Sequence, residues 1–252
     1  MFSRENLIIL EEIGSTQDVA YDMAKRWAPH GVAVMALNQT SGRGRMGRSW
    51  SSPTGKNLAL STILRPSCKP AEAPLYGLAA SVAAAMTVEA FCSQIKAQVK
   101  WPNDVIVDGR KIAGILPQAL IGNSKTEFVV IGLGLNVNSG LSDLPGEIRE
   151  KTTSMLSLSS RSFDLVEVAL SFLGSMNELH DNAERFGFRN ILDMWNARWA
   201  HRGLFVERPE VRGIAEGIDD TGALLVRTLD HGLVSVSGGE AHFHALPEKQ
   251  DH

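Results

Sequence analysis

Apolar residues recur along this chain with two different periods, which predict a mixture of strands and helices. Three apolar runs predict strands, at residues 7–13, 32–38 and 57–64. Apolar positions at helical spacing predict four helices, at about 16–27, 74–92, 164–184 and 188–201. Ser15 stands at the N-cap position of the first of these helices. The chain therefore combines both kinds of element in its first 200 or so residues.

The middle of the chain predicts consecutive strands joined by tight turns. The segment VKWPNDVIVDGRKIAGILPQAL places Asp108 and Gly109 between two apolar runs, which is the pattern of a two-residue hairpin turn. Residues 126–137, TEFVVIGLGLNV, follow as a long partner strand. Strands connected this way pair antiparallel. We therefore expect an α+β fold with a mixed, mainly antiparallel sheet and packed helices, and not a doubly wound parallel sheet.

The pattern changes after Arg202 to short strands separated by turn residues. Two turns are indicated, at 220–222 and 230–232. A segment of about 45 residues with this spacing suits a small β-barrel. We therefore expect two domains, at 1–202 and 203–248.

Charge and cysteine content narrow the class of protein. Basic residues number 25 and acidic residues 28, so a net charge of −3 provides no general attraction to nucleic acid. Cys68 and Cys92 form no CxxC pair, which favours free thiols in a reducing cytoplasm. Residues 74–92 are long enough to span a membrane, but they are rich in alanine and include Glu89. We expect a cytoplasmic protein in which this segment is an interior helix, with no membrane or nucleic-acid partner.

The segment SGRGRMGRSW, residues 41–50, contains three arginines and three glycines. Glycines let backbone amides approach an anion, and guanidinium groups offer forked donors to phosphate or carboxylate. The segment lacks the order of a nucleotide P-loop and does not open a GxGxxG turn into a helix. Alone it is therefore a weak signal, and a nucleic-acid-binding segment or a solvated surface loop is an alternative interpretation.

Two further segments carry polar side chains beside apolar strands. KWPND, residues 100–104, places a cation, an aromatic ring and two polar side chains at the mouth of the predicted hairpin. The returning strand begins near Lys111, and Gly114 leaves room for a group to lie against the backbone. GLGLNVN ends in Asn136 and Asn138, which share a side if the strand stays regular.

In this order, GRGRMGRSW, KWPND, RKIAGIL and GLGLNVN resemble the biotin protein ligase family, and the C-terminal GIAEGIDDTGALLV is similar to it as well. The resemblance implies a class II synthetase-like catalytic domain and an SH3-like C-terminal β-barrel. It implies a ligase that uses ATP, with Mg²⁺, to activate biotin as biotinyl-5′-AMP. The biotinyl group then passes to a lysine of a biotin carboxyl carrier domain. Only 14 residues precede Ser15, so we expect the form without an N-terminal DNA-binding domain. A homodimer is a possible oligomeric state.

The resemblance also assigns roles to individual residues. The biotin-binding set is Ser15, Thr16, Gln17, Gln39, Gly42, Arg43, Gly44, Arg45, Lys111 and Gly114. The nucleotide-binding set is Arg45, Arg48, Trp50, Asn103, Asp104 and Asn136. Lys111 and Arg45 are the expected catalytic residues, because a carboxylate that attacks the α-phosphorus of ATP brings two anions together. Gln17 departs from the family pattern, which commonly has asparagine there.

Several alternatives stay open at this point. The alternative interpretation of Ser15 is a helix cap, and that of Trp50 and Trp101 is a pair of core aromatics. His242 and His244 have same-face spacing, but a zinc site would need a third ligand and none is near in the sequence, so no protein-bound metal is expected. The closest alternative function is a lipoate or octanoate protein ligase, whose ligand lacks the ureido ring. The other is a biotin sensor without catalysis.

Overall fold

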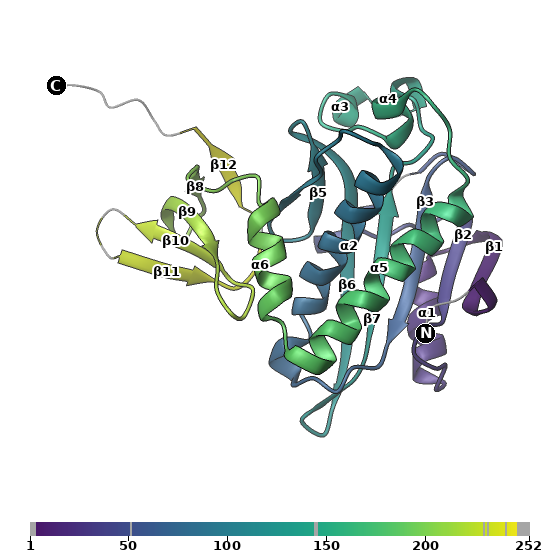
Figure 1. The fold of residues 1–252 in the computed structure, drawn as a ribbon, viewed down its shortest axis with the longest axis horizontal. Helices are drawn as coiled ribbons and strands as arrows, with labels where there is room; N and C mark the ends of the chain where they lie inside the picture. The colour runs from purple at the N-terminus through teal and green to yellow at the C-terminus, as the bar shows by residue number, and fades with distance from the viewer. Residues whose placement is uncertain are drawn as a thin grey trace.

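A seven-stranded mixed sheet forms the larger part of the computed structural model, which describes residues 4–50, 52–143, 146–228, 230, 232–239 and 241–245 (Figure 1). Its strands are β1 (Leu7–Ile13), β2 (Ala33–Gln39), β3 (Leu58–Leu64), β4 (Gln98–Lys100), β5 (Asp104–Val107), β6 (Arg110–Gly122) and β7 (Lys125–Leu135). They lie in the order β1-β2-β3-β7-β6-β5-β4. β1 and β2 pair parallel and the other neighbours antiparallel, which confirms the predicted α+β class.

Two tight hairpins set the register of β5, β6 and β7. Asp108 and Gly109 join β5 to β6 with φ values of 49° and 74°. Asn123 and Ser124 join β6 to β7 with φ values of 47° and 61°. Positive φ at both central residues matches the right-handed twist of the flanking strands. Only the first of these turns was predicted, because the pair Asp-Gly signals such a turn more strongly than Asn-Ser does.

Helices cover both faces of this sheet (Figure 1). α1 (Thr16–Lys25) packs on one face against β2, β3 and β7. α2 (Leu75–Phe91) packs on the other face against β6 and β7, and α5 (Leu165–Phe186) and α6 (Arg189–Arg198) cover it. The predicted helices are thus confirmed, with ends that differ by a few residues.

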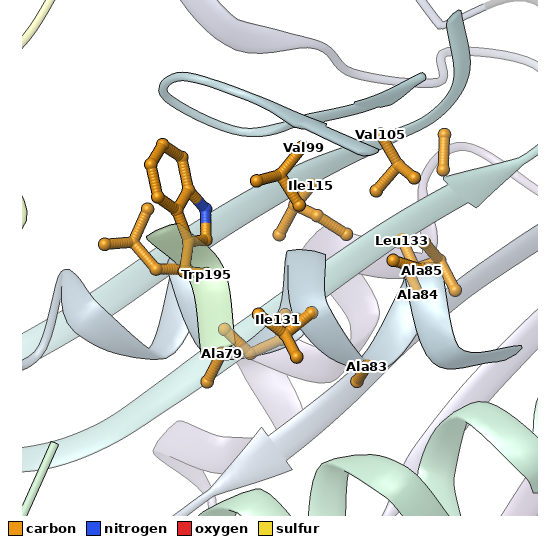
Figure 2. Packing of buried hydrophobic residues seen from close by; sticks show 14 of the residues in the cluster. Ala79, Ala83, Ala84, Ala85, Val99, Val105, Ile115, Ile131, Leu133 and Trp195 are labelled. Carbon is orange, nitrogen blue, oxygen red and sulfur yellow. The ribbon is translucent and has the colours of Figure 1, made fainter. Parts of the chain in front are cut away.

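The alanine-rich helix α2 is the centre of the larger apolar core. The apolar segment that includes it is long enough to cross a membrane, yet most of it is buried inside the described structure. Figure 2 shows Ala79, Ala83 and Ala84 of the helix in one apolar cluster with Ile131 and Leu133 of the sheet. Small side chains let the helix backbone approach the sheet closely, so the segment works as an interior helix, as predicted.

The shorter elements lie in the connections. They are η1 (Arg4–Asn6), η2 (Arg45–Gly47), η3 (Pro70–Glu72), η4 (Leu141–Asp143), α3 (Gly146–Arg149) and α4 (Met155–Ser159). The connection before α4 runs beside β6: the Lys111 amide donates to the Lys151 carbonyl at 2.8 Å, and the Thr153 amide donates to the Lys111 carbonyl at 2.9 Å. These two bonds form an isolated parallel β-bridge between Lys111 and Thr152, which holds the Lys111 backbone in place.

Five antiparallel strands form the C-terminal β domain. They are β8 (Phe205–Glu207), β9 (Arg212–Ile218), β10 (Leu224–Thr228), β11 (Gly232–Val236) and β12 (His242–His244), in the order β11-β10-β9-β8-β12. The expected domain limits of 1–202 and 203–248 stay a prediction; residues 246–248 and His231 of the second expected turn lie outside the described residues. One apolar cluster runs from the large sheet into this domain, and the Trp101 indole donates to the Gly222 carbonyl at 3.1 Å.

Candidate active site

A cavity of about 340 Å³ gathers predicted site residues from separate parts of the chain. Those that line it are Ser15, Thr16, Gln17, Gln39, Arg43, Gly44, Arg45, Arg48, Trp50, Asp104, Lys111 and Gly114. Followed from strand to strand across the sheet, the lining begins at the N-terminus of α1, beside β2 and β3, and ends at the turn between β4 and β5. The cavity is therefore elongated across the strands, and its two ends have different chemistry.

A buried network of uncharged polar groups forms the α1 end. The Thr16 amide donates to Gln39 Oε1 at 2.8 Å, and the Thr16 and Ser61 hydroxyls lie 2.9 Å apart. Ser61 Oγ donates to Gln17 Oε1 at 3.1 Å. Ser15 is the N-cap residue by position, but its side chain makes no capping hydrogen bond. This end offers donors and acceptors without charge inside an apolar wall, which suits a small polar ring.

The long side chain of Gln17 reaches two strands of the sheet. Its Nε2 donates to the Leu116 carbonyl at 3.3 Å and to the Val130 carbonyl at 3.4 Å, so the amide bridges β6 and β7. The side chain crosses in front of Gly132, where an added Cβ would lie 2.5 Å from Gln17 Oε1. A side chain at position 132 would therefore displace the Gln17 amide, and the shorter asparagine common in the family would span less of this wall.

Lys111 and Trp50 lie at the middle of the cavity. Lys111 Nζ is 2.7 Å from Asp104 Oδ1 and 5.5 Å from the centre of the Trp50 ring. The indole lies against Gly134 so closely that a Cβ there would collide with it. Trp50 Nε1 is buried and has no hydrogen-bond partner within the described residues. Trp50 is thus a wall of the cavity more than a core residue, and its ring can lie this close to β7 because residue 134 is glycine.

The arginine loop, residues 41–50, forms one side of the cavity as a small turn held by backbone hydrogen bonds. The Gly44 amide donates to the Arg48 carbonyl at 2.7 Å, and the Trp50 amide donates to the Gly42 carbonyl at 2.9 Å. Arg43 pairs with Asp18 of α1 at 3.0 Å. Arg45 Nη2 donates to the Gly239 carbonyl at 3.4 Å, so the loop reaches the C-terminal domain.

Three of the predicted residues do not line this cavity. Gly42 lies under the Trp50 backbone and lines a second, adjoining cavity of about 570 Å³ between the loop and β6. Asn103 Nδ2 donates to the Ile115 carbonyl at 3.1 Å. Asn136 is buried, and its Nδ2 donates to the Thr153 carbonyl at 3.1 Å. In this structure these two asparagines hold the backbone that surrounds the cavity.

The two asparagines of GLGLNVN also do not share a side. β7 ends at Leu135, so strand alternation does not extend to them. Asn136 accepts from Asn57 Nδ2 at 3.3 Å, whereas Asn138 exchanges hydrogen bonds with the Phe163 backbone at 2.8 and 2.9 Å. The expectation of a shared side is therefore wrong, because the chain leaves the sheet before both residues.

Sequence reasoning missed several lining residues. They are Ser49, Ser61, Lys100, Trp101, Pro102, Ile115, Leu116, Gly132, Leu133, Gly134, Ala241 and His242. Ser61 did leave a signal, since Ser61 and Thr62 are two hydroxyls in a strand that is apolar at its other positions and buried throughout. Ala241 and His242 left none, because they come from the C-terminal domain. The adjacent Phe243 packs on His201 with ring centres 4.5 Å apart, and burial and then the charge of Lys100 lower the pKa of His201 to about 4.

Comparison with known proteins agrees with this geometry. The chain matches the Biotin/lipoate A/B protein ligase family over residues 10–136 and the Biotin protein ligase C terminal domain over residues 203–243. It is 32% identical over 249 residues to the biotin--[acetyl-CoA-carboxylase] ligase of Mycobacterium tuberculosis, covering 94% of this chain and 88% of that one. It is 33% identical over 228 residues to the bifunctional ligase/repressor BirA of Bacillus subtilis, covering 89% and 70%.

A solved structure agrees as well. The biotin protein ligase of Aquifex aeolicus in complex with biotin and ATP superposes with a TM-score of 0.80 at 25% identity, and the match covers 96% of this chain and all of that one. The same two-part architecture is therefore present in both, and the chain belongs to the biotin protein ligase family.

Proposed function

We propose that this cavity activates biotin with ATP as biotinyl-5′-AMP and then transfers the biotinyl group to a lysine of a biotin carboxyl carrier domain. One observation carries the proposal. Lys111 lies between an uncharged polar end and an end that contains Lys100, Trp101 and His242. Biotin adenylate has the matching order of groups: an uncharged ring, an acyl phosphate and a nucleoside.

The α1 end favours biotin over a plain acyl chain. The ureido ring presents two N–H donors and one carbonyl acceptor, and Ser15, Thr16 and Gln39 offer partners for them. A lipoyl or octanoyl chain has no such donors and acceptors, so it would cover this polar end without forming hydrogen bonds to it, which is unfavourable. The network among Thr16, Gln17 and Ser61 is already formed, so the end requires little reordering when the ring enters.

Lys111 is placed for the first chemical step. The biotin carboxylate attacks the α-phosphorus of ATP, a C–O–P linkage forms, and the bond to pyrophosphate breaks. Both reacting groups are anions, so cations have to lower their repulsion. Lys111, Arg45 and Arg48 line this part of the cavity. The Lys111 ammonium can turn from Asp104 to the reacting oxygens without a change of backbone, because only its side chain makes that contact.

Mg²⁺ would add charge neutralisation on the triphosphate. Among the described residues lining the cavity, the only carboxylate is Asp104, and it is paired with Lys111. One carboxylate suits an ion that keeps several waters and phosphate ligands, and it does not suit a cage built by the protein. We therefore infer that Mg²⁺ arrives with ATP and that Asp104 is the residue that would contact it.

The second step needs no nucleophile from this chain. The ε-amine of the carrier lysine attacks the acyl carbon, the amide bond forms, and AMP leaves with the electron pair of the broken C–O bond. The arginine loop separates the main cavity from the adjoining one, so it covers the part of the cavity where the acyl phosphate would lie. Covering the anhydride limits its hydrolysis.

The deciding experiment incubates the protein with biotin, Mg-ATP and a carrier domain, followed by mass spectrometry. A mass increase confined to one acceptor lysine supports the proposal. Pyrophosphate exchange stimulated by lipoate or octanoate, and not by biotin, would instead identify a lipoyl-type ligase. Biotin binding without exchange would identify a sensor.

We expect the enzyme to act in the cytoplasm without a nucleic-acid partner. Cys68 and Cys92 are free thiols, as a reducing compartment allows. The chain also has a net charge of −3. Specific, salt-sensitive retention of an operator DNA at nanomolar protein would contradict the second expectation. Sedimentation with and without biotin and ATP tests whether the protein forms a homodimer.

A further inference from the structure

A buried arginine of the C-terminal domain lies at the junction with the large sheet. Arg208 follows β8 directly, and its side chain is only 9% exposed. We propose that Arg208 is a positioning residue, which holds the described residues Gly238, Gly239, Ala241 and His242 and the turn at Trp101 in place at the nucleotide end of the cavity. The expected change in kinetics rests on the proposed function. The contacts at the junction rest on geometry alone.

The guanidinium group contacts three different segments. Its Nη1 donates to the Gly238 carbonyl at 2.5 Å, and its Nη2 pairs with Glu210 Oε1 at 2.5 Å. Its central carbon lies 5.9 Å from the centre of the Trp101 ring. A planar fork can bond in its plane and cover an aromatic face at the same time, whereas a lysine ammonium cannot hold both contacts in one geometry.

The turn that Arg208 holds is also held by the arginine loop. Gly239 has a φ of +90°, and a Cβ there would lie 2.6 Å from Arg208 Nη2. The Gly239 carbonyl accepts from Arg45 Nη2 at 3.4 Å. Two and three residues further on, Ala241 and His242 line the cavity. One short segment thus connects Arg208, the arginine loop and the cavity wall.

Trp101 is the second target of Arg208. The indole is buried, lines the cavity and donates to the Gly222 carbonyl at 3.1 Å. Its neighbours Lys100 and Pro102 line the same end. Replacement of Arg208 should therefore disturb this end of the cavity in two ways, through Gly238 and Gly239 and through Trp101. The polar network of Thr16 and Gln39 lies at the opposite end of the lining.

Burying this guanidinium costs free energy, and a role in folding alone would not explain that cost. Its Nε is buried without a hydrogen-bond partner among the described residues. An apolar side chain of similar size would avoid that cost, since buried ionic groups often contribute little net stability. The orphaned Nε is therefore consistent with a group kept for the geometry it imposes.

The test compares Arg208→Met, Arg208→Lys and Gly239→Ala with a matched control, Arg212→Met. Arg212 belongs to the same domain and pairs with Glu207 at 2.8 Å, but its side chain is exposed. Biotin-dependent pyrophosphate exchange is measured over ranges of ATP and biotin. Hydrogen–deuterium exchange of the unliganded proteins is followed over residues 41–50, 100–104 and 237–245.

We expect Arg208→Met to raise the KM for ATP about tenfold while the KM for biotin stays within about twofold. Arg208→Lys should not restore the KM, Gly239→Ala should behave like Arg208→Met, and Arg212→Met should behave like the parent. In the unliganded Arg208→Met protein, amides over 237–245 and 41–50 should exchange faster than in the control.

Equal rises in both KM values, full rescue by lysine, or unchanged exchange over 237–245 and 41–50 would each overturn the inference. A parent protein that shows no biotin-dependent exchange would instead refute the proposed function. The hydrogen-exchange comparison would then decide by itself whether Arg208 organises the junction.

Discussion

The ammonium of Lys111 lies 2.7 Å from the carboxylate of Asp104, although the two residues are not paired in the β5–β6 register. Asp104 lies opposite Gly114, and Lys111 lies opposite Ile106, so the lysine side chain runs along the strand toward Asp104. Glycine at 114 allows this, since a Cβ there would lie 3.2 Å from Lys111 Nζ. Both side chains are about one-third exposed (37% and 34%), so the pair adds little to stability and can exchange partners.

Replacement of Lys111 by alanine should abolish most adenylation and leave the fold intact. Loss of a preorganised charge at the reacting oxygens costs about 3 kcal/mol, or roughly a hundredfold in rate. Biotin-dependent pyrophosphate exchange measures the loss. Lys56→Ala is the matched control, because Lys56 forms a similar pair with Asp143 at 2.7 Å and does not line the cavity. A Lys111→Ala protein with parental exchange would remove this lysine from the mechanism.

Replacement of Arg45 by glycine should weaken retention of the adenylate more than its synthesis. The change removes a cation that lines the cavity together with the bond to the Gly239 carbonyl. A loop that opens more often releases biotinyl-AMP, which then labels lysines at random. The dissociation rate of the adenylate should rise about tenfold or more.

Met46→Gly is the control for the Arg45 variant. Met46 is 71% exposed in the same loop, so its replacement adds glycine flexibility without removing a cation. Hydrogen exchange over residues 41–50, with and without biotin and ATP, shows whether the loop closes. Equal protection in both states, with equal adenylate retention in the Arg45 variant, would show that the loop is not a lid.

Alanine substitutions at two glycines of β7 should affect the binding of biotin and of ATP separately. A Cβ at Gly132 would displace Gln17, whereas a Cβ at Gly134 would displace Trp50. We expect Gly132→Ala to raise the KM for biotin and Gly134→Ala to raise the KM for ATP, each by about tenfold and with little effect on the other substrate. Each variant serves as the control of the other. Identical effects of both on the two KM values would contradict the proposed orientation of the substrates.

The packed pair His30 and His180 should make stability fall in mild acid. Their ring centres lie 4.4 Å apart, and burial, followed by the charge of His180, lowers the pKa of His30 to about 4. The unfolded histidine has a pKa near 6.5, so the unfolded chain binds more protons below that pH. The free energy of unfolding should therefore be greatest above about pH 6.5 and decrease down to about pH 4.

Urea unfolding at several pH values measures this dependence. His30→Asn keeps an acceptor for the Arg65 amide, which donates to His30 Nδ1 at 3.3 Å, and removes one titrating group. The slope against pH should become shallower by at most about 1.4 kcal/mol per pH unit. His244→Asn, at an exposed position, should leave the slope unchanged. An unaltered slope in His30→Asn would show that His30 is not protonated on unfolding.

The local pattern of the chain was enough to predict most of the large sheet and its helices. The apolar run at 7–13 coincides with β1, and the Asp108–Gly109 signal coincides with the β5–β6 turn. Strand alternation, helix period and positive-φ turn residues depend on neighbours only a few positions away, so the sequence records them directly. The anion-binding character of the arginine loop is also local, because glycines and guanidinium groups occur within one segment.

The tertiary structure decided which side chains face the cavity. Asn136 was expected there, yet it turns inward because β7 ends one residue earlier. Arg45 meets Gly239 across 194 positions of sequence, and no local pattern predicts that contact. Side-chain direction beyond a strand end, and packing between two domains, depend on long-range burial. The sequence by itself thus determined the elements and the ligase chemistry, whereas the folded chain determined which residues surround it.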